Sequence, residues 1–145
     1  MSRKDLFHEA VKRALEKDGW VITHDPFTIQ ISEAVKLKID LGAKNAIAAQ
    51  RDQEKIAVEI KSFASESEIS EFHAALGQYL NYVQALEDKE PDRTLYLAIP
   101  TDTYYDFFQM PFIQKSLKRH SVNIIVYRPT QEELEKWISF SSIDK

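Results

Sequence analysis

The stretch EKIAVEIKSF, residues 54–63, reads as a buried β-strand that is interrupted by an acid and an amine. Its side chains alternate between an aliphatic set and a set that holds both charges, namely Ile56, Val58 and Ile60 against Ala57, Glu59 and Lys61. Because successive side chains of a strand point to opposite faces, Glu59 and Lys61 share one face and lie about 7 Å apart along it. The rest of the sequence has to explain why so apolar a strand carries this pair.

The composition is that of a soluble globular protein, and residues 1–145 are expected to form a single domain. The chain is 43% apolar and 29% charged, and no run approaches the roughly 18 apolar residues of a membrane span. The charged, amphipathic N-terminus is no secretory signal, which favours a cytoplasmic protein with no membrane partner. The absence of cysteine excludes disulfides, thiolate metal sites and a cysteine nucleophile.

The charge and the short motifs narrow the function further. A net charge of −4 argues against a protein that coats nucleic acid by bulk electrostatics. The sequence contains no glycine-rich phosphate loop, no dinucleotide-binding glycine motif and no G-x-S-x-G nucleophile motif. A local basic site and an enzyme whose cation bridges to phosphate both remain open.

Hydrophobic periodicity and turn residues divide the chain into alternating elements. We expect helices at 4–18, 68–87, 103–108, 112–120 and 131–140, and strands at 20–24, 27–31, 36–43, 46–50, 55–63, 94–100 and 123–127. The strands at 46–50 and 55–63 should form an antiparallel hairpin around a turn at 51–54. This order predicts a mixed central sheet with helices on both faces, a three-layer α/β/α sandwich with its functional edge at the hairpin.

Two of these elements make specific predictions about side-chain direction. The helix at 68–87 should bury one apolar face, made of Ile69, Phe72, Leu76, Leu80 and Val83. The strand at 36–43 alternates strictly, with Leu37, Ile39 and Leu41 on one face and Lys38, Asp40 and Gly42 on the other. Asp40 is therefore expected, like Glu59 and Lys61, on the face opposite its strand's aliphatic residues.

Asp40, Glu59 and Lys61 together have the parts of a phosphodiesterase site. Two carboxylates that meet across adjacent strands offer hard oxygen ligands to Mg²⁺ or Mn²⁺. A lysine beside such a cation can orient a water and stabilise charge on a phosphoryl oxygen. The alternative, which spacing alone favours, is a half-exposed sheet on which Glu59 and Lys61 are solvated or ion-paired surface charges.

The pairing of the two strands raises a geometric question. A tight turn at Asp52 and Gln53 would place Glu59 opposite Ala46, six residues beyond Asp40. For Asp40 to meet Glu59, the chain must bend or bulge between Gly42 and Asn45, or the turn must be longer than it looks.

The motif D-x18-E-I-K, from Asp40 to Lys61, resembles the PD-(D/E)XK signature of the restriction-endonuclease-like superfamily, with Ile39 in place of the proline. Over nearly the whole chain, four segments resemble the XisH family of cyanobacterial excision controlling factors: KDLFHEAVKRALEKDGWVITHDP, KIDLGA, VEIKSF and FHAALGQYLNY. The resemblance implies a restriction-endonuclease-like fold, a role in excision of a DNA element and a partner protein, XisI.

The resemblance also implies roles for individual residues. Asp40 and Glu59 would be the metal carboxylates and Lys61 the catalytic lysine. Gln78 and Tyr82 resemble the Q-x-x-x-Y motif that some superfamily members carry on the following helix, and they share a helical face. The alternative is that Tyr82 belongs to the core and Gln78 is its chance neighbour.

Superfamily members often add an acid from the first helix, which suggests Glu9. At 100° per residue, however, Glu9 lies about 150° from the centre of the apolar arc and His8 about 110°. His8 should therefore reach the rim of the site more easily, while plain surface positions remain the alternative for both. His24 and Asp25 could form a base–acid or metal pair, although HDP at a strand end is typical of a turn.

Two functions follow from these observations. The first is a Mg²⁺- or Mn²⁺-dependent DNA endonuclease, or a subunit of one, that acts in excision of a DNA element. The second is a catalytically silent adaptor that regulates recombination through an XisI-like partner protein, which the acidic charge and a controlling role favour. A dimeric regulatory domain is a third reading, and a homo-oligomer stays open in each case.

Overall fold

In the computed structural model, residues 3–45 and 54–140 are described. The elements in chain order are α1 (Arg3–Lys17), β1 (Trp20–His24), β2 (Phe27–Gln30), β3 (Lys36–Ile39), β4 (Leu41–Asn45), β5 (Lys55–Ile60), α2 (Glu68–Lys89), β6 (Arg93–Pro100), α3 (Thr101–Tyr105), the 3₁₀ helix η1 (Phe107–Gln109), α4 (Pro111–Arg119), β7 (Ile124–Arg128) and β8 (Glu133–Ile138). The predicted mixed α/β class is confirmed.

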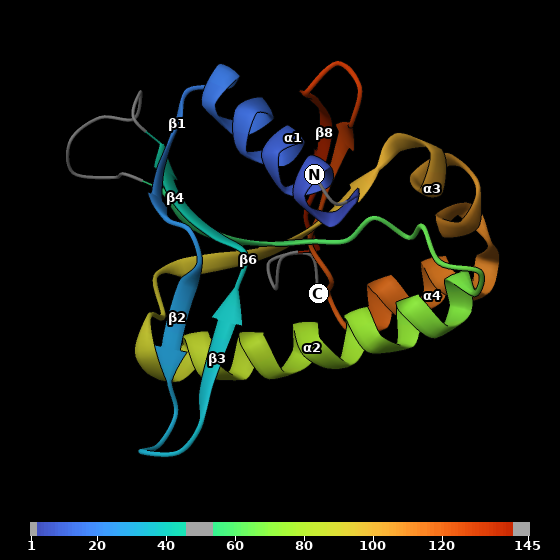
Figure 1. The fold of residues 1–145 in the computed structure, drawn as a ribbon. Coiled ribbons are helices and arrows are strands. Elements are labelled where there is room, and N and C mark those ends of the chain that lie inside the picture. Colours follow the sequence, from blue (N-terminus) through green and yellow to red (C-terminus); the bar gives the residue numbers. More distant parts are fainter. Residues whose placement is uncertain (1–2, 46–53, 141–145) are drawn as a thin grey trace.

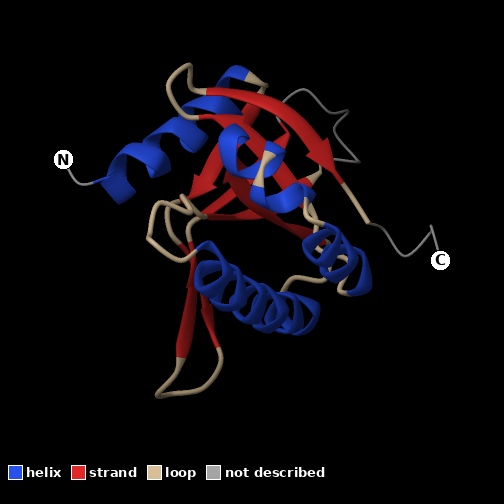
Figure 2. Ribbon diagram, turned by 90° about the vertical axis from the view of Figure 1, so that its right-hand side faces the viewer, coloured by secondary structure: helices blue, strands red, loops and turns tan. Residues whose placement is uncertain are grey.

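Six strands form one mixed sheet in the order β1-β4-β5-β6-β7-β8. Its centre is parallel, because β6 pairs in parallel with both β5 and β7, while β1, β4 and β8 are antiparallel to their neighbours. Strands β2 and β3 form a separate two-stranded antiparallel sheet that projects beside α2. The ribbon coloured by secondary structure shows that the six-stranded sheet is curled (Figure 2).

The sheet separates two hydrophobic cores, with α1 over one face and α2 and α4 over the other (Figure 1). On β5 the alternation is as predicted, since Ile56 and Val58 join the α1 core whereas Ala57 joins the α2 core. Glu59 and Lys61 follow Ala57 in the same alternation, and this directs their side chains towards α2.

The predicted single strand at 36–43 is wrong, because the chain bends at Asp40. β3 ends at Ile39 and pairs with β2, whereas β4 begins at Leu41 and pairs with β1 and β5. Ile39 consequently packs in the α2 core and Leu41 in the α1 core, instead of sharing one face. The bend transfers the chain from the small sheet to the large one.

The register of β4 and β5 answers the question of whether Asp40 reaches Glu59. Leu41 lies opposite Val58 and Gly42 opposite Ala57, so the bend at Asp40 adjoins Glu59. The connection from Asn45 to Glu54 is thus longer than the expected tight turn. The strand at 46–50 and most of the turn at 51–54 were predicted for residues 46–53, which lie outside the described residues.

The predicted C-terminal helix at 131–140 is wrong, since residues 133–138 form β8, antiparallel to β7. Local helix propensity is overridden by tertiary contacts. The ring of Trp137 lies 5.5 Å from that of Trp20 and 4.9 Å from that of Tyr96, between ring centroids. Near the turn between β7 and β8, Arg128 forms ion pairs with Glu133 and Glu135.

α2 begins as predicted at an N-cap serine, where Ser67 accepts a 3.3 Å hydrogen bond from the main-chain N–H of Ser70. Its buried face is rotated from the prediction and consists of Phe72, Ala75, Tyr79, Tyr82, Ala85 and Leu86. Ile69 and Leu80, both expected in the core, are each 41% exposed. The tyrosines replace these aliphatic residues because their hydroxyls find main-chain partners at the sheet.

The predicted pair of short helices around Pro111 is present as α3, η1 and α4. Phe107 and Phe108 pack against Phe63 and Phe72 in the α2 core, while Phe112 is exposed. Within the described part of the chain, the helices are all too short or too polar to cross a membrane.

Candidate active site

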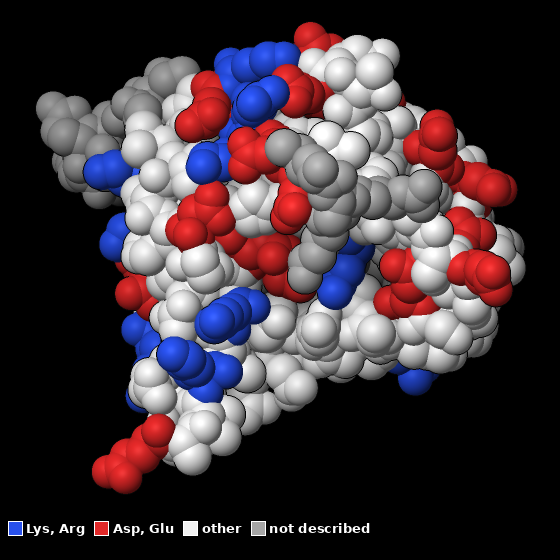
Figure 3. Space-filling model, viewed as in Figure 1, with Lys and Arg blue, Asp and Glu red and all other residues white. Residues whose placement is uncertain are grey.

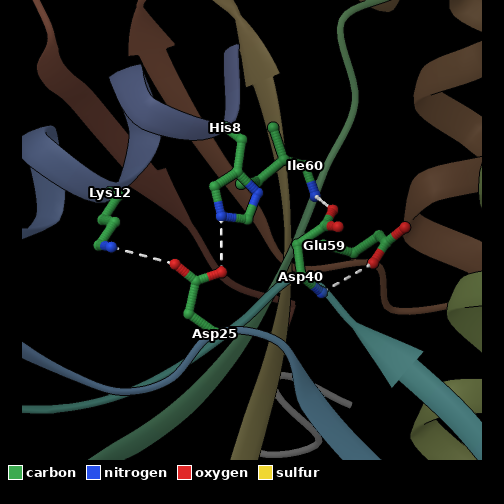
Figure 4. A network of polar contacts seen from close by, with 6 residues as sticks. All are labelled: His8, Lys12, Asp25, Asp40, Glu59 and Ile60. Atoms are coloured by element: carbon green, nitrogen blue, oxygen red, sulfur yellow. Dashed lines mark hydrogen bonds and ion pairs between the residues drawn. The ribbon is translucent and has the colours of Figure 1, made fainter. Parts of the chain in front are cut away.

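The bend at Asp40 and the end of β5 bring two carboxylates together (Figure 4). The main-chain N–H of Asp40 donates to Glu59 Oε1 across 3.3 Å, and the main-chain N–H of Ile60 donates to Asp40 Oδ2 across 2.8 Å. The carboxylate of Glu59 is therefore bound to the main chain at Asp40, and the carboxylate of Asp40 is bound to the main chain next to Glu59. This reciprocal bonding fixes the separation of the two side chains.

Lys61 lies beside this pair, as the sequence predicted. Its Nζ is 3.4 Å from Glu59 Oε2 and donates a 2.6 Å hydrogen bond to Gln78 Oε1 on α2. The main-chain carbonyl of Lys61 accepts a 3.2 Å bond from the hydroxyl of the buried Tyr127. Both the ammonium group and the backbone of Lys61 are thus positioned.

Burial gives Glu59 unusual electrostatics. The residue is only 7% exposed, and burial, followed by the nearby charge of Asp40, raises the pKa of Glu59 from 4.5 to about 7. Lys61 and the main-chain N–H of Asp40 act in the opposite direction without cancelling the effect. A buried acid of this kind holds a proton near neutral pH unless a further positive charge takes its place.

The predicted Gln78–Tyr82 pair divides between two roles. Gln78 contacts Lys61, whereas the hydroxyl of Tyr82 donates to the main-chain carbonyl of Lys38 across 3.2 Å. Burial, with smaller contributions from Glu59 and Asp40, raises the pKa of Tyr82 to about 12. Tyr82 therefore anchors β3 two residues before Asp40, and it belongs to the α2 core as the alternative reading had it.

A cleft of about 400 Å³ opens beside the two acids, and Asp40 and Lys61 line it whereas Glu59 does not. The residues that line it are Phe7, His8, Asp40, Ile60, Lys61, Ser62, Ala64 and Glu71. Of the two first-helix candidates, His8 lines the cleft and Glu9 is not among its lining residues. The helical wheel predicted this order.

His8 is held at the cleft by Asp25, which the sequence suggested as a partner of His24. His8 Nε2 lies 2.8 Å from Asp25 Oδ1, and Lys12 Nζ donates to Asp25 Oδ2 across 3.1 Å (Figure 4). His24 does not pair with Asp25 but lies 2.8 Å from Thr23 Oγ1, through Nδ1. The i, i+4 spacing of His8 and Lys12 was the available signal that both could reach one carboxylate.

Sequence reasoning also missed Glu71 of α2, which lines the cleft. Its Oε2 accepts hydrogen bonds from Ser65, 3.0 Å from the main-chain nitrogen and 2.8 Å from the hydroxyl. These contacts hold the 61–67 connection against α2. The only signal was an acid in the first turn of a helix, a common feature with no specific meaning.

Asp40 and Glu59 are the two carboxylates that these hydrogen bonds bring together, and they are the candidate metal ligands. In residues 3–45 and 54–140, no cluster of three or more histidine, aspartate or glutamate side chains could hold a metal ion. Proteins nevertheless usually contribute only one or two carboxylates to a Mg²⁺ site, and water and phosphate oxygens supply the other ligands.

Comparisons with known proteins agree with the whole-chain resemblance. The family model described as XisH protein matches residues 1–135. A crystal structure of an XisH family protein from Nostoc punctiforme PCC 73102 is 48% identical, with a TM-score of 0.83, over 93% of this chain and 100% of that chain. The crystal structure of an fdxN element excision controlling factor protein from Anabaena variabilis is 49% identical, with a TM-score of 0.83, over 93% and 99%. Comparison with curated proteins gives no match. The chain belongs to the XisH family.

Proposed function

We propose that this chain is an excision controlling factor with a restriction-endonuclease-like site that hydrolyses a DNA phosphodiester with the help of Mg²⁺ or Mn²⁺. The observation that carries the proposal is the buried Glu59, bonded to the backbone of Asp40 and paired with Lys61. The name of the Anabaena variabilis relative, an fdxN element excision controlling factor, supports the DNA element as the target.

Asp40 and Glu59 would hold the cation. Their chemistry fits, because the pKa of Glu59 is raised by burial and by Asp40, and a divalent cation would offset both effects. Bound there, the cation would supply Lewis-acid stabilisation of charge on a phosphoryl oxygen. The rest of the work falls to side chains of the cleft.

Lys61 would stabilise charge on the phosphate. An ammonium group at a fixed position is most effective where charge develops during the reaction. Gln78 holds the Nζ of Lys61 from α2, and Tyr127 holds its main-chain carbonyl from β7. The group is therefore oriented before substrate binds.

The β2–β3 hairpin would contact the DNA backbone next to the site. Its inner face packs Phe27, Ile29 and Ile39 into the α2 core, and its outer face exposes Lys36 and Lys38. Figure 3 shows acidic side chains near the centre of this face of the molecule, with basic side chains over the hairpin beside them. Local positive charge next to the carboxylates supplies phosphate contacts that the net charge of −4 does not.

A second candidate is the adaptor function, in which the chain acts through an XisI-like partner. The specific observation in its favour is the outer face of α2, where Ile69 and Leu80 are exposed. Above Gly77 on the same helix, an added Cβ would meet nothing within 4 Å. A glycine in the middle of a helix lowers helix stability by about 1 kcal/mol relative to alanine. Because Gly77 is not needed for packing within the chain, its small size suits close approach by another protein.

Plasmid cleavage distinguishes the two functions. The proposal predicts that the wild-type protein nicks or linearises plasmid DNA with Mn²⁺ or Mg²⁺, and that Lys61→Ala, still folded, does not. A stable complex with the partner protein, together with no cleavage under either cation in the presence of that partner, would select the adaptor function instead.

A further inference from the structure

We infer that His8 and Asp25 form a general-base dyad at the rim of the cleft, in which His8 accepts a proton from the attacking water. The inference rests on the proposed hydrolytic function and supplies a part that it lacks. Asp40 and Glu59 are assigned to the cation, and the ammonium group of Lys61 has no lone pair with which to accept a proton. Among the described residues that line the cleft, His8 is the one histidine, and its imidazole can accept a proton.

The geometry leaves one ring nitrogen of His8 for this task. Nε2 lies 2.8 Å from Asp25 Oδ1, so the neutral imidazole donates its N–H to the carboxylate. The Nδ1 lone pair is then the acceptor. In Figure 4 this second nitrogen lies on the side of the ring away from Asp25, and His8 lines the same cleft as Asp40 and Lys61.

Lys12 keeps Asp25 ionised and fixed. Partial burial acts to raise the pKa of Asp25, but hydrogen bonds from Lys12 and His8 outweigh it and lower the pKa below its ordinary value. One oxygen of the carboxylate binds His8 and the other binds Lys12, one turn further along α1. Asp25 and Lys12 are therefore positioning residues, and His8 is the proposed catalytic residue.

The proton transfer balances without a further reactant. The water oxygen forms a bond to phosphorus while its proton passes to His8 Nδ1. The bond from phosphorus to the leaving oxygen breaks, and its electron pair stays on that oxygen, which takes a proton from solvent. The imidazolium that results is stabilised by the ionised Asp25.

The same two contacts also tie α1 to the corner between β1 and β2, so the test must separate catalysis from tethering. We compare plasmid cleavage by His8→Ala, Asp25→Asn and the control His73→Ala, which removes an exposed imidazole from α2. His8→Ala should slow cleavage by about 10²–10⁴-fold, the usual contribution of general acid–base catalysis. Added imidazole should restore part of the rate to His8→Ala, whereas His73→Ala should cleave like the wild type.

Two further measurements do not depend on activity. Mn²⁺ binding by calorimetry should be unchanged in His8→Ala. Long-range proton–nitrogen NMR of the neutral imidazole should show His8 protonated at Nε2 in the wild type and lose this preference in Asp25→Asn.

Three results would overturn the dyad but not the proposed function. They are cleavage by His8→Ala at the wild-type rate, an NMR spectrum that shows His8 protonated at Nδ1, and a loss of rate in His8→Ala that added imidazole does not restore. No cleavage by the wild type under any condition would overturn the proposed function and the dyad with it. Loss of Mn²⁺ binding in His8→Ala would identify His8 as part of the metal site and would also overturn the dyad.

Discussion

The main-chain N–H of Asp40 donates a 3.3 Å hydrogen bond to the carboxylate of Glu59. The return contact comes from the main-chain N–H of Ile60 to the carboxylate of Asp40. Because each carboxyl group is bonded to the main chain beside the other acid, the two side chains are held together at the point where β3 becomes β4. Burial, followed by the nearby charge of Asp40, raises the pKa of Glu59.

The first prediction concerns stability and pH in the absence of metal. The pKa of Glu59 is about 7 in the folded chain and 4.5 as a free side chain, so the folded state binds more protons between these values. Stability contributed by this group is full below about pH 4.5 and is lost as the pH rises through about 7, by about 3 kcal/mol at most. Urea unfolding with a chelator at about pH 5 and about pH 8 measures the loss.

Glu59→Gln is the control for this prediction, because glutamine cannot ionise. Between about pH 5 and about pH 8, the variant should therefore lose less free energy of unfolding than the wild type, by the amount that ionisation of Glu59 contributes. If wild type and variant lose stability equally, Glu59 does not titrate in this range, and the account of its burial is wrong.

The second prediction concerns the hydroxyl of Tyr82. Tyr82→Phe keeps the ring in the α2 core but leaves the carbonyl of Lys38 without its donor, which should lower the free energy of unfolding by about 1 kcal/mol. The matched control is Tyr105→Phe, which removes a hydroxyl on the exposed surface and should change stability by less than about 0.5 kcal/mol. Equal effects in chemical denaturation would mean that Tyr82 does not anchor β3.

The third prediction concerns the orientation of Lys61. Gln78→Ala removes the acceptor of its Nζ, and cleavage should fall about tenfold or more while stability changes by less than about 0.5 kcal/mol. Gln84→Ala, an exposed glutamine on the same helix, is the control and should cleave normally. Normal cleavage by Gln78→Ala would remove Gln78 from the site.

The fourth prediction concerns the basic face of the β2–β3 hairpin. The double variant Lys36→Ala and Lys38→Ala should weaken DNA binding and reduce the salt dependence of log K by about 2, since each lost phosphate contact removes about 0.9. The double variant Lys115→Ala and Lys118→Ala removes two exposed charges from α4 and is the control. An equal effect of both variants would show attraction by overall charge rather than binding by the hairpin.

The parts of the fold that depend on short-range alternation could be predicted from sequence. β5 alternates as expected because both of its neighbours lie in the same sheet, and this alternation is what directs Glu59 and Lys61 to the α2 side. β6 and β7 could be recognised as continuous apolar runs, which is typical of strands covered on both faces.

The failures have long-range causes. Nothing local distinguishes Asp40 from any other residue of an alternating strand, because the bend depends on its bond to Ile60, 20 residues away. Residues 131–140 have local helical character, but Trp137 packs on Trp20 across the molecule. The same holds for Asp25, whose partners His8 and Lys12 lie on a preceding helix.

The most direct test of the account is the position of Mn²⁺ in a crystal soaked with the ion. Anomalous density between the carboxylates of Asp40 and Glu59, lost in Glu59→Gln, is the predicted result. Density elsewhere, or none at a Mn²⁺ concentration that supports cleavage, would contradict the assignment of these two acids as the metal site.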